Sequence, residues 1–210
     1  MTVVQKLPGA FTITDPDWPR FAMWTPGQIF TSDSFSEPGD LAGRMTDATL
    51  GGTPVRWAGD TGIFYSEGGA VAFGDTDVAG SVGVEVPAEN LELSFTIPEL
   101  PTEGFLIIFL LRDTFGSNSN QIMLRINSAG ATIIRDERGS DTLLLGSVNG
   151  TQPGDKFTIK VEGESITSSR NGTQWMDAQS RGLFDGRYAG FFRGRTTRGG
   201  QVDDFMITAR

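Results

Sequence analysis

The chain has 210 residues, with no cysteine and no histidine, and its 26 acidic and 17 basic side chains give a formal charge of −9. The absence of cysteine excludes disulfides and a thiol nucleophile, and the absence of histidine excludes an imidazole base. The acidic balance argues against binding of nucleic acid, which requires a basic face. No apolar run approaches the ~20 residues that span a bilayer, and the N-terminus carries no signal-peptide pattern.

Residues 1–31 differ in composition from the rest of the chain. Four of the ten prolines lie there, so we expect neither a long helix nor a central strand. The segment also holds aromatic side chains that would expose apolar surface in solution: Phe11, Trp18, Phe21, Trp24 and Phe30. We predict an extended N-terminal arm that docks onto its own domain, a neighbouring copy or a larger assembly. An N-terminal strand and loop packed on the body is the alternative.

From residue 32 onward, short segments with strand patterns follow one another between turn signals. Apolar and polar residues alternate in Leu91–Ile97 and in Lys156–Glu162, which predicts strands with one buried face. Phe105–Leu111 is apolar at every position and predicts a central strand covered on both faces. Asn171–Gly172 is a hairpin-turn signal. The further predicted strands are 55–57, 62–65, 70–73, 82–86, 121–126, 131–135, 142–148, 165–170, 174–177, 188–192 and 201–208.

No window of 12 or more residues carries a convincing helical stripe of apolar residues. About a dozen short, regularly spaced strands indicate an all-β fold, an antiparallel two-sheet β-sandwich. We found no internal repeat and no second linker. We therefore predict one sandwich domain at residues 32–210 after the arm at residues 1–31.

Three passages together resemble the concanavalin A-like lectin/glucanase (laminin-G-like) jelly roll. The first is Ser32-Asp-Ser-Phe35 followed by Leu41-Ala-Gly-Arg44 and Leu50-Gly-Gly-Thr-Pro-Val-Arg-Trp57. The second is Asp155–Gly163 followed by the Asn171–Gly172 turn, and the third is Tyr188-Ala-Gly-Phe-Phe192 followed by Gln201–Ile207. The resemblance covers about 175 residues, and it implies a concanavalin A-like β-sandwich.

The opening passage is also similar to modules of phage tail-associated and surface proteins. This second resemblance implies a virion protein, assembled in the host cytoplasm, for which no signal peptide is needed. Its partners would be other virion proteins, reached through the arm, and glycans of the host surface. We also expect a homo-oligomer.

Glycoside hydrolases of this fold carry two carboxylates in a Glu-x-Asp-x-x-Glu pattern on one strand, so that alternate side chains face the same groove. Glu85, Glu89 and Glu92 do not reproduce that spacing, and Pro87 interrupts the strand. We therefore predict no catalytic residues.

Adjacent residues of a strand point to opposite sides, so one of Asp203 and Asp204 should face inward. Related sandwich modules often hold a structural Ca²⁺ with carboxylates from the first and last strands, which makes Asp33 the natural partner. The sequence therefore offers Asp33, Asp203 and Asp204 as candidate calcium ligands. The alternative is that Asp203 or Asp204 forms an ion pair with an arginine such as Arg44, or caps a turn.

Sugar binding needs aromatic platforms beside amides and carboxylates, because the C–H faces of sugars stack on rings. Trp175, close after the Asn171–Gly172 turn, is the best candidate for an exposed platform, whereas Trp57 is expected in the core. The full set of candidate carbohydrate-binding residues is Trp175, Asn118, Asn120, Gln121 and Tyr188.

These observations lead to one functional expectation with two alternatives. We expect a non-enzymatic phage virion structural protein, tail- or capsid-associated, whose arm anchors it and whose sandwich faces outward for host-glycan adhesion or for decoration. A free-standing carbohydrate-binding module and, with less support, a glycoside hydrolase are the alternatives.

Overall fold

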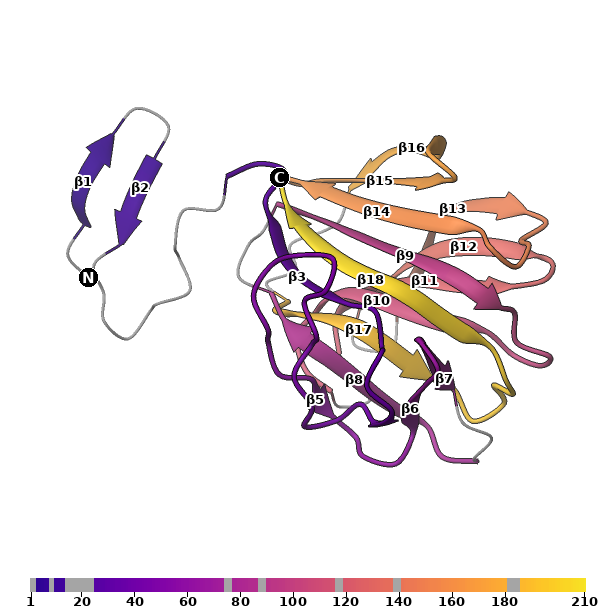
Figure 1. Ribbon diagram of the computed structural model, residues 1–210. Helices are drawn as coiled ribbons and strands as arrows, with labels where there is room; N and C mark the ends of the chain where they lie inside the picture. The colour runs from indigo at the N-terminus through magenta and orange to yellow at the C-terminus, as the bar shows by residue number, and fades with distance from the viewer. Residues whose placement is uncertain are drawn as a thin grey trace.

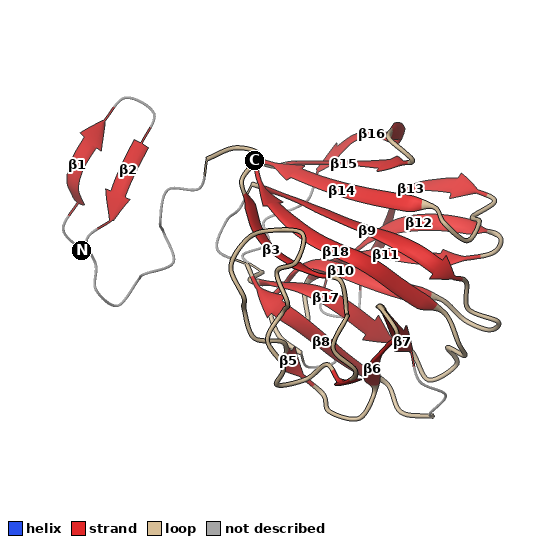
Figure 2. Cartoon of the chain, viewed as in Figure 1, coloured by secondary structure: helices blue, strands red, loops and turns tan. Residues whose placement is uncertain are grey.

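The structure, a computed structural model, describes residues 3–7, 10–13, 25–73, 77–86, 90–115, 119–137, 141–180 and 186–210. These segments form strands, turns and loops, and contain no helix (Figure 2). Within them there is accordingly no helix that is long and apolar enough to cross a membrane.

The strands of these segments follow one another along the whole chain. In chain order they are β1 (Val3–Leu7), β2 (Ala10–Ile13), β3 (Ile29–Asp33), β4 (Gly39–Asp40), β5 (Ala58–Gly59), β6 (Phe64–Glu67), β7 (Ala70–Phe73), β8 (Gly80–Glu85), β9 (Leu91–Glu99), β10 (Leu106–Arg112), β11 (Gln121–Asn127), β12 (Gly130–Glu137), β13 (Asp141–Asn149), β14 (Lys156–Glu162), β15 (Ser165–Arg170), β16 (Thr173–Ser180), β17 (Tyr188–Arg193) and β18 (Gln201–Ala209).

Two antiparallel sheets are stacked as a sandwich (Figure 1). Among the described strands, one sheet has seven in the order β13-β12-β11-β10-β17-β8-β5, and we call it the seven-stranded sheet. The other, the nine-stranded sheet, has the order β16-β15-β14-β9-β18-β7-β6-β4, with β3 also paired to β18. The predicted all-β, two-sheet antiparallel sandwich is confirmed.

Local patterns explain the central strands. In β14, Phe157, Ile159 and Val161 are buried while Thr158 and Lys160 between them are not, as the alternation predicted. β10 is buried at every position and lies between β11 and β17, which confirms a central strand covered on both faces. Asn171 and Gly172 both have positive φ and connect β15 to β16, which confirms the predicted hairpin turn.

Aromatic rings fill the space between the sheets. Trp57 is fully buried, as predicted, and its ring stacks on Phe191 at 5.5 Å between centroids and packs against Phe205 at 5.1 Å. The predicted strand at 55–57 is reduced to a single antiparallel bridge, in which Arg56 lies opposite Met45, just before β5. The backbone N–H of Trp57 donates to the carbonyl of Arg44 and its carbonyl accepts from Gly43, so this short pairing holds the ring in the core.

The sandwich begins inside the range that the sequence assigned to the arm. β3 pairs with β18 from Ile29 onward, and Phe30 packs against the core. Strands β1 and β2, at residues 3–7 and 10–13, pair antiparallel with each other. The side chain of Phe11, together with Trp18, Phe21 and Trp24, lies outside what the structure describes, so the anchoring arm stays a prediction.

Candidate functional site

The face of the seven-stranded sheet that is turned away from the core carries its own apolar cluster. Successive side chains of a strand point to opposite faces. Leu106, Ile108 and Leu110 of β10 belong to the core between the sheets, whereas Ile107 and Phe109 belong to a separate cluster. We call the face that carries this second cluster the outer face.

Strand register lines up the apolar residues of the outer face. Phe109 lies opposite Met123, Met123 opposite Ile134, and Ile134 opposite Leu144. On the other side of Phe109 the same line continues through Gly190 to Gly83. A Cβ at Gly83 would lie 2.9 Å from the ring of Phe109. The absence of a side chain at Gly83 therefore makes room for this ring.

A buried arginine connects the polar groups of the outer face. The guanidinium of Arg112 lies 5.0 Å from the ring centroid of Phe109 and 5.4 Å from that of Phe192. It donates to Oε1 of Gln121 at 2.7 Å, and Nε2 of Gln121 donates to Oδ2 of Asp136 at 3.2 Å. This chain of hydrogen bonds fixes the orientation of the Gln121 amide.

Burial lowers the pKa of Arg112 to about 10, although the carboxylates of Asp113, Asp136 and Asp60 act to raise it. The guanidinium therefore stays charged at neutral pH. Because Arg112 is almost fully buried and its donors are directed at protein acceptors, it acts as a positioning residue.

Two polar atoms of the outer face have unmet hydrogen-bonding capacity. Nε of Arg125 and Oδ1 of Asp136 are buried and have no hydrogen-bond partner among the described residues. Arg125 lies opposite Ile107 and Thr132, on one side of the apolar line, and Asp136 lies opposite Gln121 on the other side. Polar groups thus flank the apolar residues along both sides.

Partly exposed aromatic rings lie beside these groups. Phe115 and Tyr188 are in contact, with ring centroids 4.6 Å apart, and Phe115 also packs against Phe109. The backbone N–H and Nδ2 of Asn120 donate to Asp113 at 3.1 and 2.9 Å. Aromatic surface, amides and carboxylates are therefore neighbours here, which is the combination that sugar binding uses.

The structure divides the predicted carbohydrate-binding residues. Gln121 and Tyr188 lie on the outer face, with Asn120 just before β11, and Asn118 lies outside the described residues. Trp175 lies on β16 of the nine-stranded sheet, partly buried against the core, and its Nε1 is buried without a partner among the described residues. It is therefore separated from the other predicted residues and is not a freely exposed platform.

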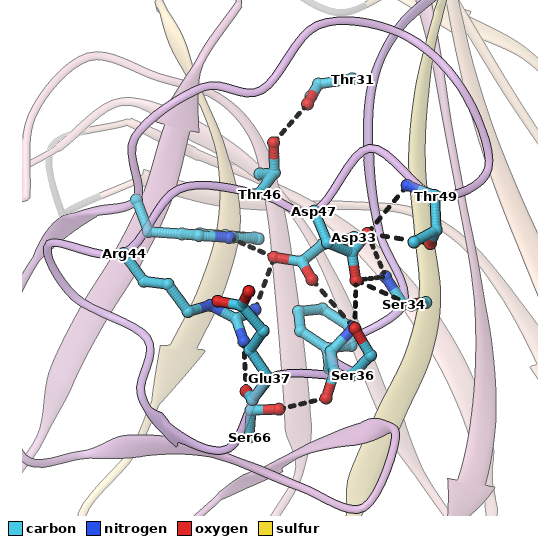
Figure 3. A network of polar contacts seen from close by, with 12 residues as sticks. Thr31, Asp33, Ser34, Ser36, Glu37, Arg44, Thr46, Asp47, Thr49 and Ser66 are labelled. Atoms are coloured by element: carbon cyan, nitrogen blue, oxygen red, sulfur yellow. Dashed lines mark hydrogen bonds and ion pairs between the residues drawn. The ribbon is translucent and has the colours of Figure 1, made fainter.

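The predicted metal ligand Asp33 is used differently. β3 and β18 pair as the calcium hypothesis required, with Asp33 opposite Phe205. The fully buried carboxylate of Asp33, however, accepts hydrogen bonds from Nε1 of Trp57 at 2.7 Å, from Arg44 at 2.7 Å and from the backbone N–H of Phe35 at 2.8 Å (Figure 3). Burial raises the pKa of Asp33 even though these donors and the charge of Arg44 act to lower it.

Asp203 and Asp204 also have protein partners. Oγ1 of Thr96 donates to Asp204 at 3.2 Å, and the backbone N–H of Asp204 donates to Asp203 at 2.6 Å, at a point where Asp204 has positive φ. The described residues contain no group of three or more acidic side chains arranged to hold a metal ion. These side chains do not fit a calcium site in this arrangement, because the oxygens of Asp33 are already occupied.

A second carboxylate, Asp47, organises the neighbouring loop. It accepts hydrogen bonds from the backbone N–H and hydroxyl groups of Ser34 and of Thr49, and from the hydroxyl of Ser36 (Figure 3). Burial acts to raise the pKa of Asp47, but the hydrogen bonds from Thr49 and Ser34 hold it well below its ordinary value.

Asp203 lies in an unfavourable electrostatic environment. Burial raises its pKa above the ordinary 3.8, and the carboxylates of Asp204, Asp47 and Asp33 raise it further. The ionised side chain is therefore disfavoured in the folded state, and stability is lost as pH rises through the raised pKa. We expect Asp203→Asn to increase the melting temperature by a few degrees at neutral pH, with no gain below pH 3.8.

Thermal melts of wild type and Asp203→Asn across this pH range measure the effect. The exposed Asp177 on β16 supplies the matched control, because Asp177→Asn should leave the difference near zero at every pH. A lower melting temperature for Asp203→Asn at neutral pH would show that the charge of Asp203 stabilises the fold.

Sequence reasoning missed three residues of the outer face. Asp136, which lies in β12, is not among the candidate residues named from the sequence, and neither are Arg112 and Arg125. One signal was available for Arg112, since a charged residue directly ends an apolar run that is buried on both faces. Nothing in the sequence indicates that Arg125 and Asp136 flank the same apolar residues.

No family model and no curated protein matches the chain. Solved structures do match it. The non-specific endo-β-1,3(4)-glucanase SCLam of family GH16 has a TM-score of 0.59 at 10% identity, over 87% of this chain and 91% of that chain. The Ca²⁺/Man-bound exoplasmic/lumenal domain of VIP36 has a TM-score of 0.57 at 11% identity, over 81% and 89%. A Bacillus subtilis protein of unknown function with a galectin-like fold has 0.55 at 10%, over 89% and 98%.

At such identities the likeness establishes the fold alone. The chain has the concanavalin A-like jelly roll that occurs in lectins and in glucanases, which confirms the resemblance found in the sequence. Because both binding proteins and hydrolases share this fold, it does not decide whether the chain is an enzyme.

Proposed function

We propose that this chain is a non-enzymatic glycan-binding protein whose ligand lies on the outer face of the seven-stranded sheet. One observation carries the proposal. The partly exposed rings of Phe115 and Tyr188 share a face with the hydrogen-bonded chain of Arg112, Gln121 and Asp136. Rings bind the C–H faces of a sugar, and neighbouring amide and carboxylate groups bind its hydroxyls. The exposed Asp113 and the partly exposed Asn120 are accessible for this, whereas Gln121 is buried and holds its neighbours in place.

The biological setting that we propose is the surface of a phage particle, with the arm of residues 1–31 as the anchor. Its support is the resemblance of the opening passage to phage surface modules, together with the aromatic residues of the arm. In this setting the bound glycan belongs to the surface of the bacterial host.

The non-enzymatic part of the proposal rests on the sequence. No Glu-x-Asp-x-x-Glu pattern is present in the chain. Of the glutamates considered for catalysis, Glu92 is paired with Arg210, and Glu85 lies opposite Tyr188 at the end of β8.

A bacterial-glycan array, probed with the full-length protein in calcium and in chelator, tests the proposal. We expect specific binding that Tyr188→Ala weakens about fivefold or more, since a lost aromatic stacking contact costs about 1 kcal/mol or more. Tyr65→Ala is the matched control: the only other tyrosine of the chain is 38% exposed and lies on β6 of the nine-stranded sheet. Trp175→Ala tests the platform predicted from the sequence.

The outcomes separate the hypotheses. Absence of binding in both buffers would contradict glycan binding and favour a purely structural role. Binding that depends on Trp175 or Tyr65 rather than on Tyr188 would place the ligand on the nine-stranded sheet. Release of reducing ends from a bound polysaccharide would show that the protein is a hydrolase.

A further inference from the structure

The outer side of β3 accepts backbone hydrogen bonds from the loop at residues 48 and 53. The four remaining edges of the two sheets differ in how open they are to another strand. β5 and β4, each at one edge, have two residues apiece, and very short edge strands offer little to pair with. β16, at the third edge, carries Asp177 and has two irregularities in its pairing with β15. β13, at the fourth edge, has nine residues from Asp141 to Asn149.

β13 has fewer of the features that usually protect an edge strand. Asp141 stands at its start and one irregularity interrupts its pairing with β12, whereas β16 has a charge in mid-strand and two irregularities. Its residues from 142 to 149 include no charged residue and no proline, although the chain as a whole carries a charge of −9. β13 pairs with β12 along its whole length, with one irregularity opposite Ile133–Ile134, and no described strand pairs with its other edge. That edge therefore presents backbone hydrogen-bonding groups over an extended length.

Apolar side chains accompany the open backbone. Leu143 is 48% exposed and Leu144 is 58% exposed. They are neighbours in a strand, so they point to opposite faces of the sheet. A second strand placed beside β13 would find one exposed leucine above the sheet and one below it.

We propose that two copies of this chain pair edge to edge through β13, antiparallel, and join their seven-stranded sheets into one continuous sheet. A second copy fits better than an unrelated acidic or basic peptide, because the open edge is uncharged. Two chains of equal negative charge can approach there without opposing carboxylates. An antiparallel pair of identical strands has two-fold symmetry, so each copy uses the same surface.

The geometry of such a pair has a functional consequence. The two-fold axis of an antiparallel strand pair is perpendicular to the sheet, so both outer faces lie on the same side of the dimer. A dimer with two outer faces on one side could bind a glycan surface through both copies at once. This consequence rests on the proposed glycan binding, whereas the pairing itself does not.

Sedimentation of the full-length protein across a concentration series tests the pairing. We expect a species of twice the 22.6 kDa chain mass, in equilibrium with the single chain at low concentration. Leu144→Glu should weaken the dimer about 100-fold or more, because a carboxylate added beside the two-fold axis faces its copy. Val78→Glu is the matched control, since Val78 is 57% exposed and receives the same charge.

Hydrogen exchange of the wild-type protein supplies a measurement that needs no variant. Backbone amides of β13 should exchange more slowly as protein concentration rises, whereas those of β16 should not change. A single chain at every concentration overturns the proposal, and so does a dimer that Leu144→Glu leaves intact or that Val78→Glu weakens equally. A protein that binds glycan but stays a single chain would contradict the β13 pairing and leave the proposed glycan binding intact. Failure of the pairing can therefore be told apart from failure of the proposed function.

Discussion

Replacing Asp33 by alanine is expected to lower the free energy of unfolding by about 3–5 kcal/mol, the usual effect of removing one partner of a buried ion pair. The carboxylate has no exposed surface, and the Arg44 side chain that it holds is only 12% exposed. Its loss would leave the guanidinium of Arg44, the indole N–H of Trp57 and the backbone N–H of Phe35 without their acceptor (Figure 3). Denaturation by urea, followed by tryptophan fluorescence, measures the change.

An exposed ion pair of the same chain provides the control. Asp77 pairs with Arg198 at 2.5 Å, but its side chain is 89% exposed. Asp77→Ala should therefore cost about 1 kcal/mol or less. In addition, Asp33→Ala combined with Arg44→Met should recover part of the loss, because the unpaired charge is then absent. Equal losses for Asp33→Ala and Asp77→Ala would show that the buried pair does not hold the loop in place.

Phe191→Ala is the second substitution with a large expected effect, also about 3–5 kcal/mol of unfolding free energy. The ring of Phe191 is fully buried in the middle of the aromatic core. Five rings lie around it with centroids 5.4–6.3 Å away, namely those of Phe35, Trp57, Phe64, Phe73 and Phe205. Alanine would leave a cavity that both sheets would have to collapse to fill.

The next residue of the same strand is the matched control. Phe192 points to the outer face, is partly exposed, and contacts Arg112 rather than the aromatic core. Phe192→Ala should cost roughly 1–2 kcal/mol, because less apolar area is lost from the buried state. Calorimetry of both variants distinguishes the two faces of β17, and losses of equal size would contradict a core centred on Phe191.

The sequence predicted those parts of the fold that depend on neighbouring residues. Alternation marked β9 and β14, and continuous apolarity marked β10. The Asn171–Gly172 pair marked the turn after β15, where both residues have positive φ. The segment 55–57 was overestimated by the same reasoning, because its pairing with residues 43–46 amounts to one bridge and not to a full strand. Trp57 is held there by the core and by Asp33, and Asp33 precedes it by 24 residues.

The candidate site was less predictable because strand pairing assembles it. Gln121 and Tyr188 were found through their residue types, since an amide and an aromatic ring suit sugar binding wherever they lie. Arg112 and Asp136 meet on either side of Gln121 only through the register of β10, β11 and β12. Trp175 was selected because it follows a turn, but packing against the core keeps its ring from full exposure.

β18, the last strand of the chain, lies inside the nine-stranded sheet. It pairs with β9 along one side, and with β7 and then β3 along the other (Figure 1). On a ribosome, residues 29–99 therefore emerge long before the strand that joins their two halves. The nascent chain can close local hairpins such as β14–β15, but the sheet is completed only after residues 201–209 have emerged. Until then the edges of β3 and β9 that pair with β18 present unpaired backbone groups.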